Sequence, residues 1–247
     1  MTRERRPILV VLGLLAVAVV STVAFDFWRC HQVERELLGL TADEIPSHPS
    51  LVAFARPRGE SSYVSNCAVC HGADLRGDAA RGVPNLQDDA WLFGLGALSD
   101  IETTIQYGIR SGHPKARNIT DMPAYLRIGQ LAPAEIDDVV EYVLSLSGQP
   151  HDAAAAKRGS EVYSYKGNCF DCHSTDALGN SDYGAPALTG AAFVYGGGRE
   201  ILRHSVAEGR HGLCPAWIDE LSPSEVRELA VYLHSVSHQG ARAAPPG

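Results

Sequence analysis

Apolar residues occur along this chain in two arrangements, one long unbroken run near the N-terminus and shorter stripes at helical spacing further on. The run extends from about Ile8 to Phe25 and is followed directly by Phe27 and Trp28. Its length is close to the minimum for a helix that spans a membrane, and aromatic residues are typical of the membrane–water interface. We therefore predict an N-terminal transmembrane helix, a membrane anchor over residues 1–28.

Two later stripes have the spacing of one face of an amphipathic helix. They are formed by Ile136, Val139, Val140, Val143 and Leu144, and by Val226, Leu229, Ala230 and Leu233. A capping box at Ser222–Glu225 starts the second of these helices, and a similar box at Ser99–Glu102 predicts another helix. We expect each striped helix to close a domain and to pack against the rest of that domain. Strand signals are scarce, so the predicted fold class is mainly α.

The region after residue 50 contains an internal sequence repeat of two copies. The paired positions are Gly59 and Gly159, Tyr63 and Tyr163, Pro84 and Pro186, Gly94 and Gly196, Met122 and Cys214, and Tyr125 and Trp217. Each copy is about 90 residues long, which is enough for a small domain. We predict two tandem domains of one kind at 51–148 and 157–238. The other segments are assigned to linkers at 29–50 and 149–156 and to a tail at 239–247.

Both copies contain the motif Cys-x-x-Cys-His, at Cys67–His71 and at Cys169–His173. This is the attachment sequence of a c-type haem, in which two thiols bond the porphyrin and the histidine binds the iron. Zinc ribbons place their two cysteine pairs roughly 15–20 residues apart, whereas about a hundred residues separate these pairs. We predict two covalently bound haem c groups, one in each of two tandem cytochrome c-like domains, with a zinc or dithiol site as the alternative. The predicted attachment residues are Cys67, Cys70, Cys169 and Cys172, and the predicted iron ligands within the motifs are His71 and His173.

The remaining ligands of the first site follow from position in the repeat. A metal-bound imidazole needs a hydrogen-bond partner on its other nitrogen, and the backbone carbonyls of Pro84 and Pro186 are candidates for this role. The sixth iron ligand of a c-type cytochrome is often a methionine. Met122 is the only methionine besides Met1, so we predict that it serves the first haem.

The second copy carries Cys214 where the first carries Met122. We predict that Cys214 binds the second iron as a thiolate, which would lower the potential of that haem. Alternatives are ligation by His211 or His204, or a disulfide between Cys214 and Cys30, which an oxidising compartment would permit. Because two haems would replace much of an ordinary core, we also expect the protein without haem to be poorly folded.

Charge and the N-terminal arginines indicate the compartment. Arg3, Arg5 and Arg6 precede the apolar run, which predicts a cytoplasmic N-terminus and haem domains on the outer, periplasmic side of a bacterial inner membrane. A cleaved signal peptide ending near Ala24 is the alternative. The formal net charge is −8, which argues against nucleic acid as a partner and suits a basic partner such as a soluble cytochrome c.

Several short segments resemble the two-haem subunit of cbb3-type cytochrome c oxidases, called subunit III or the FixP-type subunit. The similar segments are Asn66–Gly72, Pro84–Leu86, Trp91–Gly94, Thr104–Gly108, Asp121–Ala124, Tyr142–Gly148, Gly184–Pro186, Gly209–Arg210 and Pro215–Trp217. The resemblance implies a membrane-anchored subunit that passes electrons from a soluble or membrane-bound cytochrome c donor toward the catalytic and monohaem subunits of the oxidase. In that family the second domain carries methionine in place of Cys214, so a divergent paralogue is an alternative.

Two other functions compete with this relay. A stand-alone thiosulfate-type sulfur-compound dehydrogenase is suggested by the His/Cys haem, with Arg210, Arg199 or Arg203 as candidate anion-binding residues. A redox or gas sensor ranks last, because the sequence offers no output domain. No catalytic side chain is predicted, since the cofactor supplies the chemistry and the chain supplies its ligands and surroundings.

Overall fold

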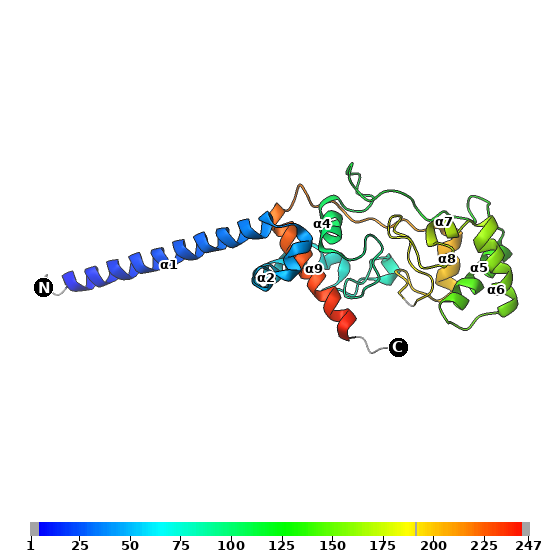
Figure 1. Cartoon of the computed structure of the whole chain (residues 1–247), viewed down its shortest axis with the longest axis horizontal. Helices are drawn as coiled ribbons and strands as arrows, with labels where there is room; N and C mark the ends of the chain where they lie inside the picture. Colours follow the sequence, from blue (N-terminus) through cyan, green and yellow to red (C-terminus); the bar gives the residue numbers. More distant parts are fainter. Residues whose placement is uncertain (1–4, 191, 244–247) are drawn as a thin grey trace.

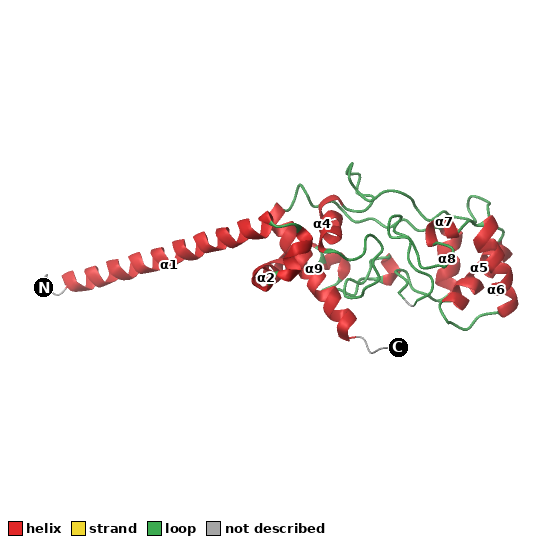
Figure 2. Cartoon of the chain, viewed as in Figure 1, coloured by secondary structure: helices red, strands yellow, loops and turns green. Residues whose placement is uncertain are grey.

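The structure is a computed structural model that describes residues 5–190 and 192–243 of the chain. Within these residues the regular elements are helices joined by long loops, as Figure 2 shows, and β-type pairing is limited to isolated bridges. The predicted mainly α fold class is confirmed. The ends of the predicted anchor and tail, 1–4 and 244–247, lie outside the described residues.

The N-terminal helix projects from the rest of the molecule as a long rod (Figure 1). This helix, α1 (Arg5–Gly39), contains 35 residues, and the part from Leu12 is long enough for a membrane span and includes an unburied 18-residue window with a mean hydropathy of 1.6. It continues through much of the segment expected as a linker, which also contains the 3-10 helix η1 (Ala42–Ser47). Arg227 closes its end by donating to the carbonyls of Leu37 and Leu40 at 2.9 and 3.1 Å.

Each copy of the repeat supplies a similar set of helices. The first contains α2 (Pro49–Asn66), α3 (Ala68–His71), the 3-10 turn η2 (Ala79–Arg81), α4 (Leu98–Tyr107) and α5 (Pro133–Leu146). The second contains α6 (Ala153–Glu161), its π-helical continuation η3 (Val162–Lys166), α7 (Phe170–His173), α8 (Arg199–Glu208) and α9 (Pro223–Ala243). The expected tail is therefore partly helical.

One predicted capping box is present and the other is absent. At the start of α9 the backbone N–H of Ser222 donates to the carboxylate of Glu225 at 2.9 Å, and the backbone N–H of Glu225 donates to the hydroxyl of Ser222 at 3.3 Å. The prediction of a capping box at Ser99 is wrong, because α4 begins at Leu98 with Ala97 as its N-cap, and Ser99 therefore lies inside the helix. Ser99 donates instead to Asp43 of η1, through its backbone N–H at 2.9 Å and its hydroxyl at 2.7 Å. The side chain therefore ties α4 to η1.

The last helix of each copy packs in the other copy's half of the molecule. Helix α9 packs against α2 and α4, whereas α5 packs against α6 and α8. We call the half formed by α2, α3, α4 and α9 the anchor-side half, because it adjoins α1, and the half formed by α5–α8 the outer half (Figure 1). The expectation that each striped helix packs on its own domain is therefore wrong.

Equivalent glycines explain how both exchanged helices fit. A Cβ at Gly59 of α2 would collide with the carbonyl of Glu228 in α9, and a Cβ at Gly159 of α6 would collide with that of Asp138 in α5. The first helix of each copy, α2 or α6, thus allows the same close crossing, and the last helix of each copy, α5 or α9, carries the same apolar stripe. Because the sequence determines the buried face and not the partner, either pairing satisfies the apolar pattern.

Two separate cores result from this exchange. The anchor-side core includes Leu51, Tyr63, Ile101 and Ile105 of the first copy with Val226, Leu229 and Leu233 of the second. The outer core includes Ile136, Val139 and Val140 of the first copy with Tyr163, Leu202 and Val206 of the second. Each half therefore buries apolar side chains from both repeats, and neither repeat folds into a core of its own.

Candidate haem sites

Both Cys-x-x-Cys-His motifs open into one cavity between the two halves. This cavity has a volume of about 680 Å³, and its walls are formed mainly by aliphatic and aromatic side chains from both cores and the connecting loops. A large, flat apolar cofactor attached at either motif would be buried there rather than left in water. The residues present therefore fit two haems, one attached at each motif.

Each motif forms one helical turn, α3 in the anchor-side half and α7 in the outer half. His71 N–H bonds to the carbonyl of Cys67 at 3.0 Å, and His173 N–H bonds to that of Cys169 at 2.9 Å. Residues three and four apart on a helical turn share one face. Within each motif the second thiol and the imidazole therefore face the cavity together with the first thiol.

Backbone carbonyls orient both imidazoles. His71 Nδ1 lies 3.1 Å from the carbonyl oxygen of Pro84, and His173 Nδ1 lies 2.9 Å from that of Pro186. Burial lowers the pKa of both histidines, against the opposing effect of these hydrogen bonds. A neutral imidazole that donates from Nδ1 leaves Nε2 free to bind a metal.

Tyrosines hold the ends of both motifs, a role that sequence reasoning did not assign. Tyr63 donates to the carbonyl of Gly72 at 2.5 Å, and Tyr163 donates to that of Ser174 at 2.6 Å. Tyr125, from the first copy, donates to the carbonyl of Gly167 ahead of the second motif at 2.8 Å. The roles of Tyr63 and Tyr163 could have been predicted, because the two tyrosines are equivalent in the repeat. The role of Tyr125 depends on the exchange of the last helices between the two halves.

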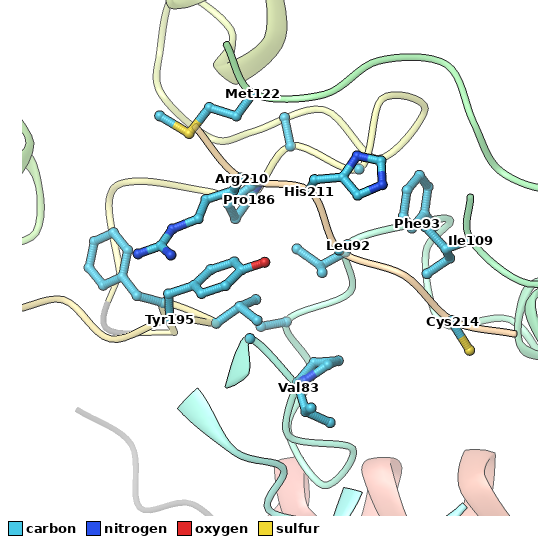
Figure 3. Close-up of a pocket in the computed structure, with 18 of the residues that line it drawn as sticks. Val83, Leu92, Phe93, Ile109, Met122, Pro186, Tyr195, Arg210, His211 and Cys214 are labelled. Atoms are coloured by element: carbon cyan, nitrogen blue, oxygen red, sulfur yellow. The ribbon is translucent and has the colours of Figure 1, made fainter. Parts of the chain in front are cut away.

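Two loops carry the candidate sixth ligands, and we call them the first ligand loop (109–122) and the second ligand loop (209–215). Ile109 and Cys214 exchange two backbone hydrogen bonds of 2.9 Å, and Met122 and Arg210 exchange two of 3.2 Å. The loops therefore run antiparallel, so that Met122 and Cys214 lie at opposite ends of the pair, as Figure 3 shows.

The two sulfurs lie in the opposite halves from those that the repeat suggested. Met122 packs against the outer core, and Cys169 of the second motif packs against the same core. Burial, and then the nearby thiol of Cys70, raise the pKa of Cys214 to about 11, and Cys214 in turn contributes to the raised pKa of Cys67. Cys214 thus lies near the first motif and Met122 near the second. The expected pairing of Met122 with the first haem and Cys214 with the second is corrected, for the same reason as the helix exchange.

The structure places the alternative ligands of the second site differently: a carboxylate holds His211 Nδ1 and leaves its Nε2 free, whereas His204 lies on the exposed face of a helix. His211 Nδ1 lies 2.9 Å from Asp121 Oδ2, and His204 is an exposed residue of α8. Cys30 and Cys214 are both free thiols. Cys30 belongs to α1, where its sulfur accepts a hydrogen bond from Arg58 at 3.3 Å. The disulfide considered for these cysteines is therefore not formed.

An arginine that sequence reasoning missed links the two ligand loops. Arg110 donates to the carbonyls of Gly212, at 2.9 Å, and Thr120, and forms an ion pair with Asp121. Burial alone would raise the pKa of Asp121, but the hydrogen bond from His211 and the charge of Arg110 lower it below its ordinary value. Arg110 follows Gly108 by two residues, as His211 follows Gly209, so the repeat aligns it with a histidine and gives no signal for an arginine.

The fold and the paired motifs define a membrane-anchored c-type cytochrome with two haem sites. The cytochrome c family model matches residues 57–147, and the model for cytochrome c oxidase, cbb3-type, subunit III matches residues 154–233. Both predicted haem c groups are therefore confirmed as covalently bound cofactors of this chain.

Individual relatives match nearly the whole chain. The FixP subunit of cbb3-type cytochrome c oxidase from Bradyrhizobium sp. (strain ORS 278) is 43% identical over 232 residues, covering 91% of this chain and 77% of the relative. FixP from Azorhizobium caulinodans is 40% identical over 81% of this chain and 66% of its own length, and CcoP from Cereibacter sphaeroides is 37% identical over 83% and 69%. The chain belongs to this FixP/CcoP family, as the sequence resemblance predicted.

Proposed function

We propose that this chain relays electrons within a cbb3-type terminal oxidase, from a cytochrome c donor toward the catalytic and monohaem subunits. When bound, the two haems supply reversible one-electron chemistry, and the chain supplies ligands, burial and orientation. The observation that carries this proposal is the single cavity onto which both Cys-x-x-Cys-His motifs open. Two cofactors in one apolar cavity are close enough for an electron to pass between them without leaving the protein.

The proposed iron ligands combine residues from both repeats. His71 and Cys214 serve the anchor-side haem, and His173 and Met122 serve the outer haem. Support comes from the nearness of Cys214 to Cys67 and Cys70 and from the packing of Met122 and Cys169 against the same outer core. A thioether raises the reduction potential of a haem, whereas a thiolate donates electron density to the iron. The outer haem should therefore have the higher potential.

The proposed placement in the cell follows from the anchor. With α1 in a bacterial inner membrane and its N-terminus in the cytoplasm, both haem domains face the periplasm, where thioether attachment takes place. The anchor-side half then lies next to the membrane and the outer half reaches away from it (Figure 1). A soluble donor would meet the outer half first, and the net charge of −8 favours a basic donor through electrostatic steering.

A sulfur-compound dehydrogenase is the second candidate function. It was suggested by Cys214 as an iron ligand, and Cys214 lines the cavity. Its expected anion site receives little support. Arg199 and Arg203 are paired with Glu141 and Asp137 at 2.6 and 2.7 Å. Arg210 stacks over the ring of Tyr195 at 4.0 Å. The relay is therefore the better-supported function.

One experiment separates these two candidates. The full-length chain is purified from its membrane under mild detergent, and the preparation is tested for a haem–copper subunit, for haem reduction by thiosulfate and sulfite, and for haem oxidation by tetrathionate. The relay predicts copurification with the haem–copper subunit and no electron exchange with the sulfur compounds. Isolation of the chain alone, together with rapid reduction by thiosulfate, would establish the dehydrogenase instead.

A further inference from the structure

The side chain of Arg110 makes three contacts, of which one crosses to the second ligand loop and two stay within the first. It comes from the first ligand loop, and only 11% of it is exposed. One guanidinium nitrogen donates to the carbonyl of Gly212 in the second ligand loop at 2.9 Å, and the other donates to the carbonyl of Thr120. The contact of its Nε with Asp121 is an ion pair and is not a well-directed hydrogen bond. A single buried cation thus holds both loops.

These contacts lie within two residues of both candidate sixth ligands. Thr120 and Asp121 directly precede Met122, and Gly212 precedes Cys214 by two residues. The residue before Arg110, Ile109, exchanges its backbone hydrogen bonds with Cys214 itself. A displacement of Arg110 would therefore shift the backbone that carries each sulfur.

The backbone of Arg110 is held in a costly conformation. Its φ of +49° lies in the left-handed region, which side chains other than glycine rarely adopt. Such a conformation persists when the surrounding contacts over-determine it, and it occurs preferentially at functional sites. Here the contacts are the bonds to Gly212 and Thr120 and a backbone hydrogen bond from Arg110 N–H to the carbonyl of Arg117 at 3.1 Å.

The link extends to the surface through Asp121. The carboxylate contacts Arg110 with one oxygen and His211 Nδ1 with the other, at 2.9 Å. His211 belongs to the second ligand loop, so the chain Arg110–Asp121–His211 crosses between the loops a second time. The carboxylate keeps the guanidinium in place, while the guanidinium reaches the two carbonyls.

We propose that Arg110 is a positioning residue that couples the two haem sites, because it fixes the loops of Met122 and Cys214 as one unit. This inference rests on the proposed function, in which these two sulfurs are the sixth ligands. The planar guanidinium presents several donors in fixed directions. It can therefore reach two carbonyls and a carboxylate that lie in different directions from it. A lysine would keep the charge and lose this planar fork of donors.

The test compares Arg110→Gln with Arg203→Gln in the full-length holoprotein. Arg203 is the matched control, because it also joins the two repeats, through Asp137 at 2.7 Å, but at an exposed surface away from the ligand loops. Low-temperature EPR and a redox titration report the ligand set and potential of each haem. We expect Arg110→Gln to diminish the native low-spin signals of both haems and to shift both potentials, and Arg203→Gln to leave both unchanged. A change at one haem only, or equal changes in the control, would overturn the proposal.

One further variant keeps the test decisive. If Arg110→Gln does not fold, Arg110→Lys replaces it, and a smaller loss of the native signals at both haems is expected because the fork is lost. Native signals from both haems in Arg110→Lys would overturn the role of the fork.

Failure of the proposed function would look different. In that case Met122→Ala and Cys214→Ala would each leave both EPR signals unchanged. If these variants each alter one haem while Arg110→Gln alters neither, the ligand assignment stands and the positioning role of Arg110 is wrong.

Discussion

Met122 and Cys214 lie at opposite ends of two antiparallel loops that cross between the repeats. Met122 pairs through its backbone with Arg210 at 3.2 Å, and Cys214 pairs with Ile109 at 2.9 Å. Each loop thereby delivers its sulfur to the half of the molecule that contains the other repeat's Cys-x-x-Cys-His motif. The two haem sites are thus built jointly, and a change in one loop should be felt through the other.

Replacement of Cys214 by methionine should raise the potential of one haem only. Exchange of a thiolate for a neutral thioether removes electron density from the iron. We expect the anchor-side haem to rise by on the order of a few tenths of a volt, within the roughly 0.8 V range that axial ligands span. A redox titration monitored by visible absorption measures both potentials. An unchanged pair of potentials would remove Cys214 from the iron, and Cys30→Met serves as a control for the loss of a free thiol.

The glycines at the helix crossings should be intolerant of substitution. A Cβ at Gly59 would meet the carbonyl of Glu228, and one at Gly159 would meet that of Asp138, so the helices must separate. We expect each Gly→Ala variant to lower the free energy of unfolding by about 1–3 kcal/mol, measured by thermal unfolding of the holoprotein. Gly190→Ala is the control, because its Cβ would meet nothing within 4 Å. Wild-type stability in Gly59→Ala would contradict the close crossing of α2 and α9.

Glu228 should make stability depend on pH. Burial raises the pKa of this carboxyl from 4.5 to about 7, although the charge of Arg58 opposes the shift. The folded protein therefore holds a proton that the unfolded chain releases, and the free energy of unfolding should fall as pH rises from about 4.5 to about 7.

The variant Glu228→Gln isolates this contribution. It removes the titration and should flatten the fall in melting temperature across that pH range, while the exposed Glu220→Gln should retain it. A steeper fall in Glu228→Gln than in the wild type would show that the carboxyl is charged in the folded protein.

Loss of the haems should loosen the centre of the molecule more than its ends. The cavity of about 680 Å³ between the halves would be left without its apolar filling, whereas the helix crossings at Gly59 and Gly159 would remain. We expect protein that lacks all four motif cysteines to be cleaved rapidly by proteases in the loop between His71 and Leu98, with limited proteolysis and mass spectrometry as the measurement. Protection equal to that of the holoprotein would show that the loops fold without haem.

The local features of this fold could be predicted from the sequence, and the long-range partners could not. The stripe at Val226, Leu229 and Leu233 and the capping box at Ser222 are local signals, and α9 forms where they indicate. The same stripe in α5 offers an equally good partner for α2, so helical periodicity cannot distinguish a helix packed within its repeat from one exchanged between repeats.

The candidate sites divide in the same way. The four motif cysteines, His71 and His173 lie in short motifs whose geometry is local, whereas the positions of Met122 and Cys214 follow from the exchange. Arg110 is a buried side chain with a left-handed backbone, and nothing in its sequence neighbourhood distinguishes it from a solvent-exposed loop arginine. Its contacts depend on a loop about a hundred residues away, which local sequence patterns do not reveal.

The crossed ligand sets can be tested most directly on a protein with one haem. In Cys67→Ala/Cys70→Ala, the anchor-side haem is not attached and the haem at Cys169 and Cys172 remains. Low-temperature EPR of this variant, with and without Met122→Ala, reports the ligands of the remaining iron. We predict a His/Met signal that Met122→Ala abolishes. A His/Cys signal that survives Met122→Ala and disappears in Cys214→Ala would contradict the account.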